Sequence, residues 1–242
     1  MIAELVREKI EATNPLDILS FKDFNESSTE KLAVAKELSN LFKRGILKKI
    51  SKGMYYKPKF SRFGELSPSD DEILMKYLEL SMDKVGYISG VNVYRGMGLT
   101  TQISREYVIM NDTRQGIINI NNIQIKFIKT PIQIQKELSE EDITSLCILD
   151  ALQDIKNIPA CTPSNALKIL TYRIKELSQE QKQKLYSFAL FYKPMVRALL
   201  GLILDQIGEQ KFAIQLKATL NPLTKFQVGL TSGLSGKQWN IV

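Results

Sequence analysis

The clearest helical pattern in the chain begins at residue 27 and ends at residue 45. Ser27 is followed three residues later by Glu30, which is the spacing of a capping box at a helix start. Apolar side chains then recur at helical spacing, and Gly45 stands where a residue with positive φ commonly ends a helix. The apolar face predicted by this spacing consists of Leu32, Ala35, Leu38, Leu41 and Phe42. We therefore expect a long capped helix that ends at Gly45.

Two shorter helical signals precede this helix, and a β-hairpin follows it. Apolar residues within 5–10 lie on one side of a short amphipathic helix, and the phenylalanines of residues 21–24 flank a turn or a one-turn helix. Residues 46–51 and 54–57 read as two strands, and Ser51-Lys52-Gly53 forms a tight turn between them. Helix, short helix, long helix and hairpin is the element order of a winged helix-turn-helix. We assign this domain to residues 1–62.

Residues 67–242 predict a larger, mainly helical α+β domain. The Pro, Gly and Ser residues of segment 59–69 mark a connection, and Ser69 or Ser67 can cap the helix that follows. Strand-like runs at 105–111, 116–120 and 123–129 predict a small antiparallel sheet. Helical patterns cover 138–155, 163–177, 179–192 and 194–207, and the tail predicts a further strand or two. The expected fold class is α+β, with an N-terminal winged helix-turn-helix before the larger domain.

The positive charge of the chain is concentrated in the predicted winged helix-turn-helix. The whole chain has 33 Lys or Arg and 26 Asp or Glu, a net charge of +7. The segment from Lys22 to Arg62 holds eleven Lys or Arg against four Asp or Glu, and this surplus equals the net charge of the whole chain. Such an asymmetry is typical of a segment that binds a polyanion.

The residue types predict two kinds of DNA contact. In a winged helix-turn-helix the N-terminal half of the second long helix enters the major groove. The candidates for contacts to bases or to the groove are Ser28, Thr29, Lys31 and Lys36. The candidates for phosphate contacts are Lys43, Arg44, Lys48, Lys49, Lys52 and Lys57.

Composition argues against most enzyme classes. The chain contains no histidine, which removes the commonest general base and most nucleophile and zinc arrangements. A magnesium nuclease could use Asp112 and Lys126, but Gln124 stands where a second carboxylate is needed. We therefore expect no enzymatic activity, no cofactor and no metal. We also expect a cytoplasmic protein, because no apolar run has the length of a signal sequence or of a membrane span.

Three segments resemble the AbiEi group, which are antitoxins of type IV toxin-antitoxin systems. They read DFNESSTEKLAVAKELSNLFKRGILKKISKGMYYKP, FGELSPSDDEIL and GYISGVNVYRGMGLTTQIS, and the likeness resumes at NPLTKFQVGLTSGLSGKQWNIV. The resemblance implies an autorepressor that binds inverted repeats in its own promoter. It also implies a second domain that counteracts a nucleotidyltransferase-like toxin, with direct contact left open. The bases Arg95, Arg105 and Lys126 are candidates for the surface of that antitoxin domain.

Three alternatives remain open at this point. The chain could be a winged-helix regulator without a toxin partner. Its basic hairpin could bind RNA instead of DNA. It could also be an enzyme that acts on nucleic acid, in which case its activity would depend on a metal and on Asp112.

Overall fold

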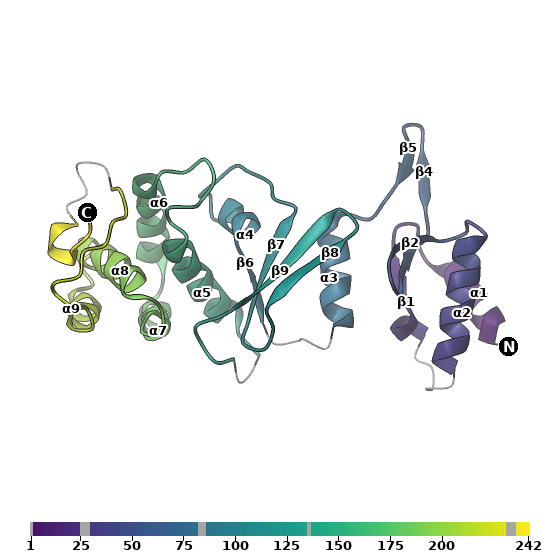
Figure 1. The fold of residues 1–242 in the computed structure, drawn as a ribbon, viewed down its shortest axis with the longest axis horizontal. Coiled ribbons are helices and arrows are strands. Elements are labelled where there is room, and N and C mark those ends of the chain that lie inside the picture. Colours follow the sequence, from purple (N-terminus) through teal and green to yellow (C-terminus); the bar gives the residue numbers. More distant parts are fainter. Residues whose placement is uncertain (1, 25–29, 82–85, 135–136, 231–235) are drawn as a thin grey trace. The chain divides into compact units, whose positions relative to one another are not determined.

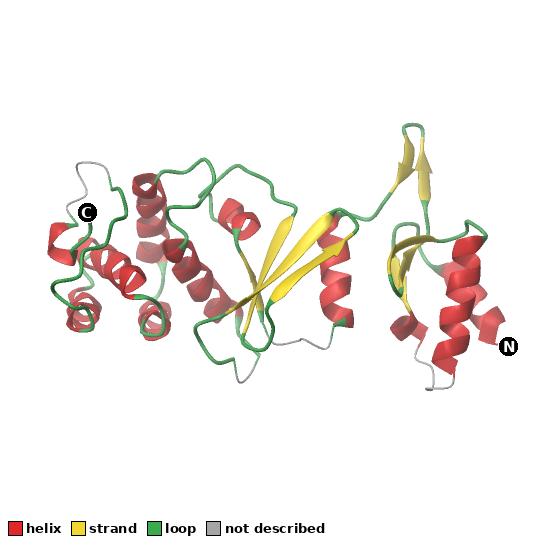
Figure 2. Ribbon diagram, in the orientation of Figure 1, coloured by secondary structure: helices red, strands yellow, loops and turns green. Residues whose placement is uncertain are grey.

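The computed structural model describes residues 2–24, 30–81, 86–134, 137–230 and 236–242. Contacts divide the chain into two compact units. One consists of Met1–Lys84 with Ile118–Ile125, and the other of Val85–Ile117 with Lys126–Val242. Figure 1 labels the helices and strands of each unit, and Figure 2 separates helices, strands and loops by colour.

The first unit contains the predicted elements in the predicted order. It begins with helix α1 (Ile2–Ala12), strand β1 (Ile18–Ser20) and the 3₁₀ helix η1 (Phe21–Phe24). Helix α2 (Glu30–Lys43) follows, and then the hairpin of β2 (Lys48–Ser51) and β3 (Met54–Tyr56). A second hairpin, β4 (Lys59–Ser61) and β5 (Gly64–Leu66), leads to helix α3 (Asp70–Leu80). The predicted capping box at Ser27 lies outside the described residues.

The predicted β-hairpin is confirmed and belongs to a three-stranded sheet. Strand β3 is central, and the order is β1-β3-β2 with both pairings antiparallel. Gly53 at the hairpin turn has φ 82°, and Gly45 after α2 has φ 74°. Residues with a Cβ rarely adopt these values, so glycine is required to end the helix and to turn the hairpin as predicted.

The buried face of α2 differs from the predicted face. Val34, Leu38 and Leu41 are buried, whereas Leu32 is 78% exposed and Phe42 is 39% exposed. Ala35, also predicted to be buried, is exposed. The buried residues follow the i, i+4, i+7 spacing of a helix stripe. Apolar residues occupy two overlapping stripes on α2, and packing against α1 and the sheet selects the one that contains Val34.

The second unit combines a small antiparallel sheet with a layer of helices. It starts with β6 (Tyr87–Ser89), α4 (Val91–Gly96) and β7 (Glu106–Asn111). Strands β8 (Gly116–Ile120) and β9 (Ile123–Lys129), whose residues 118–125 are counted with the first unit, complete a sheet in the order β6-β7-β9-β8. Helices α5 (Glu140–Gln153), α6 (Pro163–Glu176), α7 (Gln179–Ala189), α8 (Pro194–Gln206) and α9 (Gln210–Ala218) follow, and η2 (Lys237–Trp239) lies near the C-terminus. The three predicted strands and the predicted helices from residue 138 to residue 207 are thus confirmed to within a few residues at their ends.

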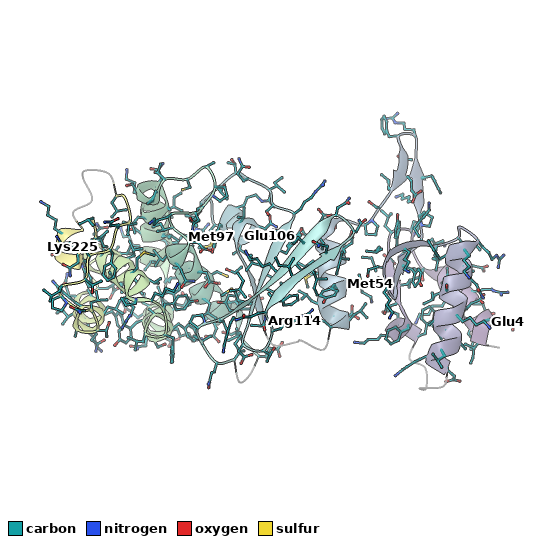
Figure 3. The ribbon with its side chains drawn as sticks, viewed as in Figure 1. Glu4, Met54, Met97, Glu106, Arg114 and Lys225 are labelled. Carbon is teal, nitrogen blue, oxygen red and sulfur yellow. The ribbon has the colours of Figure 1, made fainter. Side chains whose placement is uncertain are left out.

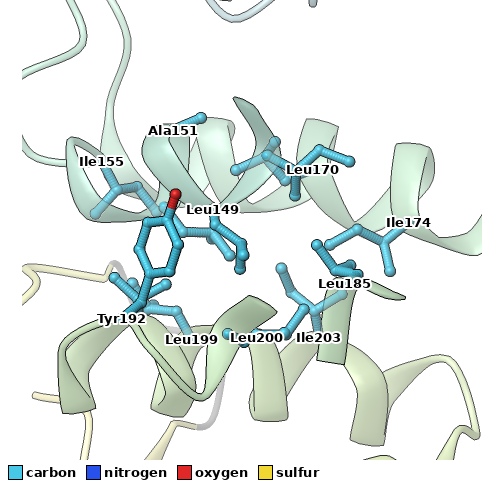
Figure 4. Packing of buried hydrophobic residues seen from close by; sticks show 14 of the residues in the cluster. Leu149, Ala151, Ile155, Leu170, Ile174, Leu185, Tyr192, Leu199, Leu200 and Ile203 are labelled. Carbon is cyan, nitrogen blue, oxygen red and sulfur yellow. The ribbon is translucent and has the colours of Figure 1, made fainter. Parts of the chain in front are cut away.

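Helix α8 lies at the centre of the second unit's core. Every residue from Ala198 to Leu204 is buried, so this helix is apolar on all sides. Figure 4 shows Leu199, Leu200 and Ile203 of α8 facing Leu149 of α5 and Leu185 of α7. The predicted helix starts are also confirmed, because Thr162 caps α6 and Ser69 forms a capping box with Glu72 at α3.

Three segments adopt structures that the sequence did not predict. Residues 18–20, expected only to lead out of the first helix, form strand β1, and part of the expected connection 59–69 forms the β4–β5 hairpin. Residues 210–218 form helix α9 where the tail predicted a strand, and within the described tail Phe226 and Ile241 form only an isolated bridge. Strands β1, β4 and β5 are three residues long, which is too short to show an alternating pattern of apolar residues.

The predicted α+β class is confirmed by this arrangement of helices and antiparallel sheets. Among the described residues, no helix combines the length and the apolar character that crossing a membrane would require.

Candidate nucleic-acid interface

The first part of the candidate interface is the exposed face of α2. Lys31 lies in the first turn of α2, Lys36 follows one and a half turns later, and both side chains are exposed. Lys43 and Arg44 are exposed at the other end of the helix. Ser28 and Thr29, the predicted groove contacts that precede this turn, lie outside the described residues.

The second part is the β2–β3 hairpin, which is held against the helices. Its turn lies next to η1, because a Cβ atom on Gly53 would lie 4.0 Å from the ring of Phe21. The ring of Tyr55 in β3 lies 6.3 Å from the ring of Phe42 in α2. Lys49 and Lys52 are exposed on this hairpin, whereas Tyr55 and Tyr56 are buried beneath it. The packing therefore fixes an exposed basic hairpin relative to an exposed basic helix.

Two of the four acids between Lys22 and Arg62 are paired with bases that lie outside this segment. Arg7 of α1 donates a hydrogen bond to Glu37 of α2 over 2.7 Å, and this bond is the main reason why the pKa of Glu37 is lowered. Lys76 of α3 lies 2.6 Å from Asp23. Burial alone would raise the pKa of Asp23, but hydrogen bonds from Lys76 and Ser20 outweigh it and the net pKa is lowered. The bases of the segment are left with fewer acids to oppose them.

The predicted phosphate contacts divide into engaged and free bases. The Lys57 ammonium donates to the carbonyl oxygens of Ile10, Glu11 and Thr13, where a cation stabilises the C-terminal end of α1. Lys48 pairs with Glu65 over 3.2 Å. Lys57 therefore has a structural role, and Lys48 is partly neutralised.

The other six predicted bases form no ion pair with any residue that the structure describes. They are Lys31, Lys36, Lys43, Arg44, Lys49 and Lys52. Free lysines on one helix face and its hairpin are suited to bind phosphates, because each of them can replace a condensed counterion.

The candidate antitoxin bases occupy separate elements of the second unit. Arg95 is exposed on α4 and Arg105 is exposed just before β7. Lys126 of β9 is half-buried, and its Nζ atom lies 4.0 Å from Oε2 of Glu106. Glu106 is labelled in Figure 3. Lys126 and Glu106 line a small pocket of about 280 Å³, whereas Arg95 and Arg105 do not line it. Of the three bases, Lys126 is thus the one that lines this pocket.

Asp112, the residue on which the nuclease alternative depends, takes part in a backbone contact. One carboxylate oxygen of Asp112 accepts a hydrogen bond from the backbone of Ile134, which gives Asp112 a structural role. Over the described ranges, no group of three or more acidic, cysteine or histidine side chains is arranged to hold a metal ion.

Two features of the second unit were missed by the sequence reasoning. The first is an open, largely apolar pocket of about 1100 Å³ between β6, α4, α5 and α6, lined in part by Tyr87, Val93, Ile148 and Ile169. Four separate elements form this pocket, so no local pattern could reveal it. Arg173 at its edge donates to the carbonyl oxygens of Gly96 and Met97 and thereby ties α6 to the end of α4.

The second missed feature is a buried carboxyl in α5. Asp150 is 3% exposed and accepts 2.7 Å hydrogen bonds from the hydroxyls of Ser89 and Tyr192. Burial raises the pKa of Asp150 to about 6, although these hydrogen bonds oppose the shift. The same burial raises the pKa of Tyr192. In the sequence, an acid within the apolar run LCILDALQ could have indicated a buried carboxyl. Its partners could not be predicted, because Ser89 belongs to β6 and Tyr192 to the loop before α8.

Comparisons with known proteins identify a family and a shared fold. Residues 5–185 match the model of a family described as "Family of unknown function (DUF6088)". The chain is also similar to the crystal structure of the RV2827C protein from Mycobacterium tuberculosis, with a TM-score of 0.58 and 11% sequence identity. That similarity covers 99% of this chain and 88% of the other, and at this identity it shows the fold alone. No curated protein sequence matches the chain.

Proposed function

The chain belongs to the DUF6088 family of unknown function, and we propose that it is a DNA-binding transcriptional repressor. In this proposal the first unit is a winged helix-turn-helix. Helix α2 is its recognition helix, the β2–β3 hairpin is its wing, and α1 with η1 supports both. The protein would act in the cytoplasm, where the DNA that it regulates is found.

The observation that carries this proposal is the free basic surface that α2 shares with the hairpin. Lys36 on the helix and Lys49 and Lys52 on the hairpin are exposed and form no ion pair with the described residues. A duplex can receive the first turns of α2 in its major groove while the hairpin bases contact the adjacent phosphates. We therefore infer that Lys31 and Lys36 contact the groove. The phosphates are contacted by Lys43, Arg44, Lys49 and Lys52.

Binding to the DNA immediately upstream of its own coding sequence tests this proposal. We expect the protein to bind that duplex more tightly than a duplex of scrambled sequence or a structured RNA of the same length. If about five phosphates are contacted, log K should fall against log salt with a slope of roughly −4 to −5. Gel-shift titrations at several salt concentrations measure both quantities. Tighter binding to the RNA, or equal binding to all three, would refute the proposal.

We further propose that the second unit gives the protein an antitoxin role, as the AbiEi resemblance implies. The functional counterpart is a nucleotidyltransferase-like toxin, and Arg95, Arg105 and Lys126 are the first residues to test. We expect co-expression of the full-length chain to restore growth of cells that produce such a toxin from a neighbouring gene. Replacing Lys126 with Glu should weaken the rescue without changing DNA affinity. No rescue by the wild-type chain would leave a regulator without a toxin partner as the better account.

A further inference from the structure

The β4–β5 hairpin exposes aromatic side chains at the end of a basic segment. Phe63 at its turn is 86% exposed and Phe60 is 72% exposed. The two strands form their own sheet, and Figure 1 shows them extending away from the three-stranded sheet of the same unit. An isolated hairpin of this size is marginally stable in water, and side chains this exposed bury little apolar surface within the fold. The exposure of Phe60 and Phe63 is what a partner that covers both rings would explain.

The base of this hairpin is held to the rest of the first unit just before β4 and at β5. Lys57, two residues before β4, is tied to the end of α1 by its three hydrogen bonds to carbonyl oxygens. Glu65 of β5 accepts a hydrogen bond from the Tyr56 hydroxyl and pairs with Lys48, each over 3.2 Å. The Lys57 contacts reach α1 and the Glu65 contacts reach β2 and β3, so the base of the β4–β5 hairpin is attached to the elements that form the proposed DNA-binding surface.

The turn of the hairpin combines a cation with an aromatic ring. The guanidinium of Arg62 lies over the ring of Phe63, 4.8 Å from its centroid. The Ser61 side chain accepts a hydrogen bond from the backbone of Phe63 and donates one to the carbonyl oxygen of Gly64, which holds the turn in shape. Lys59 adds a second exposed base, whereas the one acid of the hairpin, Glu65, is already paired with Lys48. The free charge of the hairpin is therefore positive.

We propose that the β4–β5 hairpin is an arm that enters the minor groove of DNA next to the site bound by α2. This proposal rests on the proposed DNA binding of the first unit. Arg62 would lie in the groove, where the negative potential of the duplex is strongest in narrow regions. Phe63 would press between two base pairs and bend the duplex, as apolar wedges do in minor-groove binders.

The size and charge of the hairpin favour DNA over a protein partner. A stable protein interface buries about 800 Å² on each side, and a large aromatic side chain supplies about 150–250 Å². Phe60, Phe63 and Leu66 are the exposed apolar side chains of the hairpin, and the rest of such an interface would have to include the exposed bases Lys59 and Arg62. A single wedge with two adjacent cations is sufficient for a groove contact.

The experiment compares wild type, Phe63→Ala and Arg62→Ala on the DNA upstream of the protein's own coding sequence. We expect Phe63→Ala to bind roughly tenfold more weakly, because one base contact by an aromatic ring is lost, and to bend the duplex less. Arg62→Ala should reduce the salt slope by about 1. Leu223→Ala is the matched control, because Leu223 is 87% exposed in the second unit and should leave affinity and bending unchanged. Affinity is measured by gel shift, and bending by energy transfer between dyes at the duplex ends.

Three results would contradict the proposal that the β4–β5 hairpin enters the minor groove. The first is full affinity and bending by Phe63→Ala while Lys49→Glu weakens binding, which would leave the proposed function intact. The second is a change in sedimentation or in thermal midpoint caused by Phe63→Ala in the absence of DNA, which would mean that the ring packs against protein. The third is the absence of duplex binding by the wild type, which would overturn the proposed function as well.

Discussion

At the scale of single residues, Asp150 is a carboxyl that is almost completely removed from water, with 3% of its surface exposed. It lies within the apolar helix α5 and is held by the hydroxyls of Ser89 and Tyr192. No base lies among its hydrogen-bond partners in the described structure. Burial therefore penalises its charged form, and this raises its pKa to about 6.

This raised pKa predicts how Asp150 affects stability. Between its ordinary pKa near 4 and its folded pKa of about 6, the folded chain binds more protons than the unfolded chain, so stability falls as pH rises. Asp150→Asn cannot ionise and should lack this fall. Its stability relative to wild type should increase by up to about 2–3 kcal/mol between pH 4 and pH 7. Urea denaturation at both pH values measures the difference. A difference between the two proteins that is constant with pH would contradict the argument.

Residue-level signals were predictable where both partners are close in sequence. Gly45, Gly53, Ser69 and Thr162 each have the backbone conformation or the cap that their neighbours indicated. The roles of Glu37 and Lys57 were not predictable, because Arg7 and the α1 carbonyl oxygens lie 30 or more residues away in sequence. A base counted as a phosphate contact from composition can therefore prove to be part of the fold, as Lys57 does.

At the scale of elements, long periodic segments were predictable and short ones were not. The helices from α5 to α8 and the strands β7, β8 and β9 agree with the apolar pattern because each repeats its period at least twice. Strands β1, β4 and β5 have three residues each. Strand β1 forms by pairing with β3, which is distant in sequence, and β4 forms by pairing with the adjacent β5. Helix α2 was predicted as an element, but its buried face was set by α1.

At the scale of elements, packing also holds the β2–β3 hairpin and α2 together. The Phe42–Tyr55 contact and the packing of Gly53 beside Phe21 connect helix, 3₁₀ helix and hairpin. Acids that would weaken this surface are paired with Arg7 and Lys76, which belong to α1 and α3. The supporting helices thus contribute both packing and charge neutralisation to the proposed interface.

At the scale of the whole molecule, the positive charge of the proposed interface is a local feature and not a property of the whole first unit, because the other residues of that unit carry more acids than bases. The surplus of positive charge that equals the net charge of the chain lies between Lys22 and Arg62, within the first unit. The second unit has a large apolar core, an open apolar pocket and a buried carboxyl network. The sequence alone could predict the local surplus between Lys22 and Arg62, whereas the pocket and the network depend on contacts between elements far apart in the chain.

The central claim is that α2 and the β2–β3 hairpin bind one duplex together. The most direct test is the affinity of the Lys31→Glu, Lys49→Glu, Lys52→Glu triple variant for the DNA upstream of its own coding sequence. The matched control reverses three exposed lysines of the second unit, Lys168, Lys211 and Lys225, and so changes the net charge equally. We predict that the first variant binds about 100-fold more weakly with a salt slope reduced by about 3, while the control stays within a fewfold of wild type. Equal losses in both variants, or no loss in the first, would contradict the account.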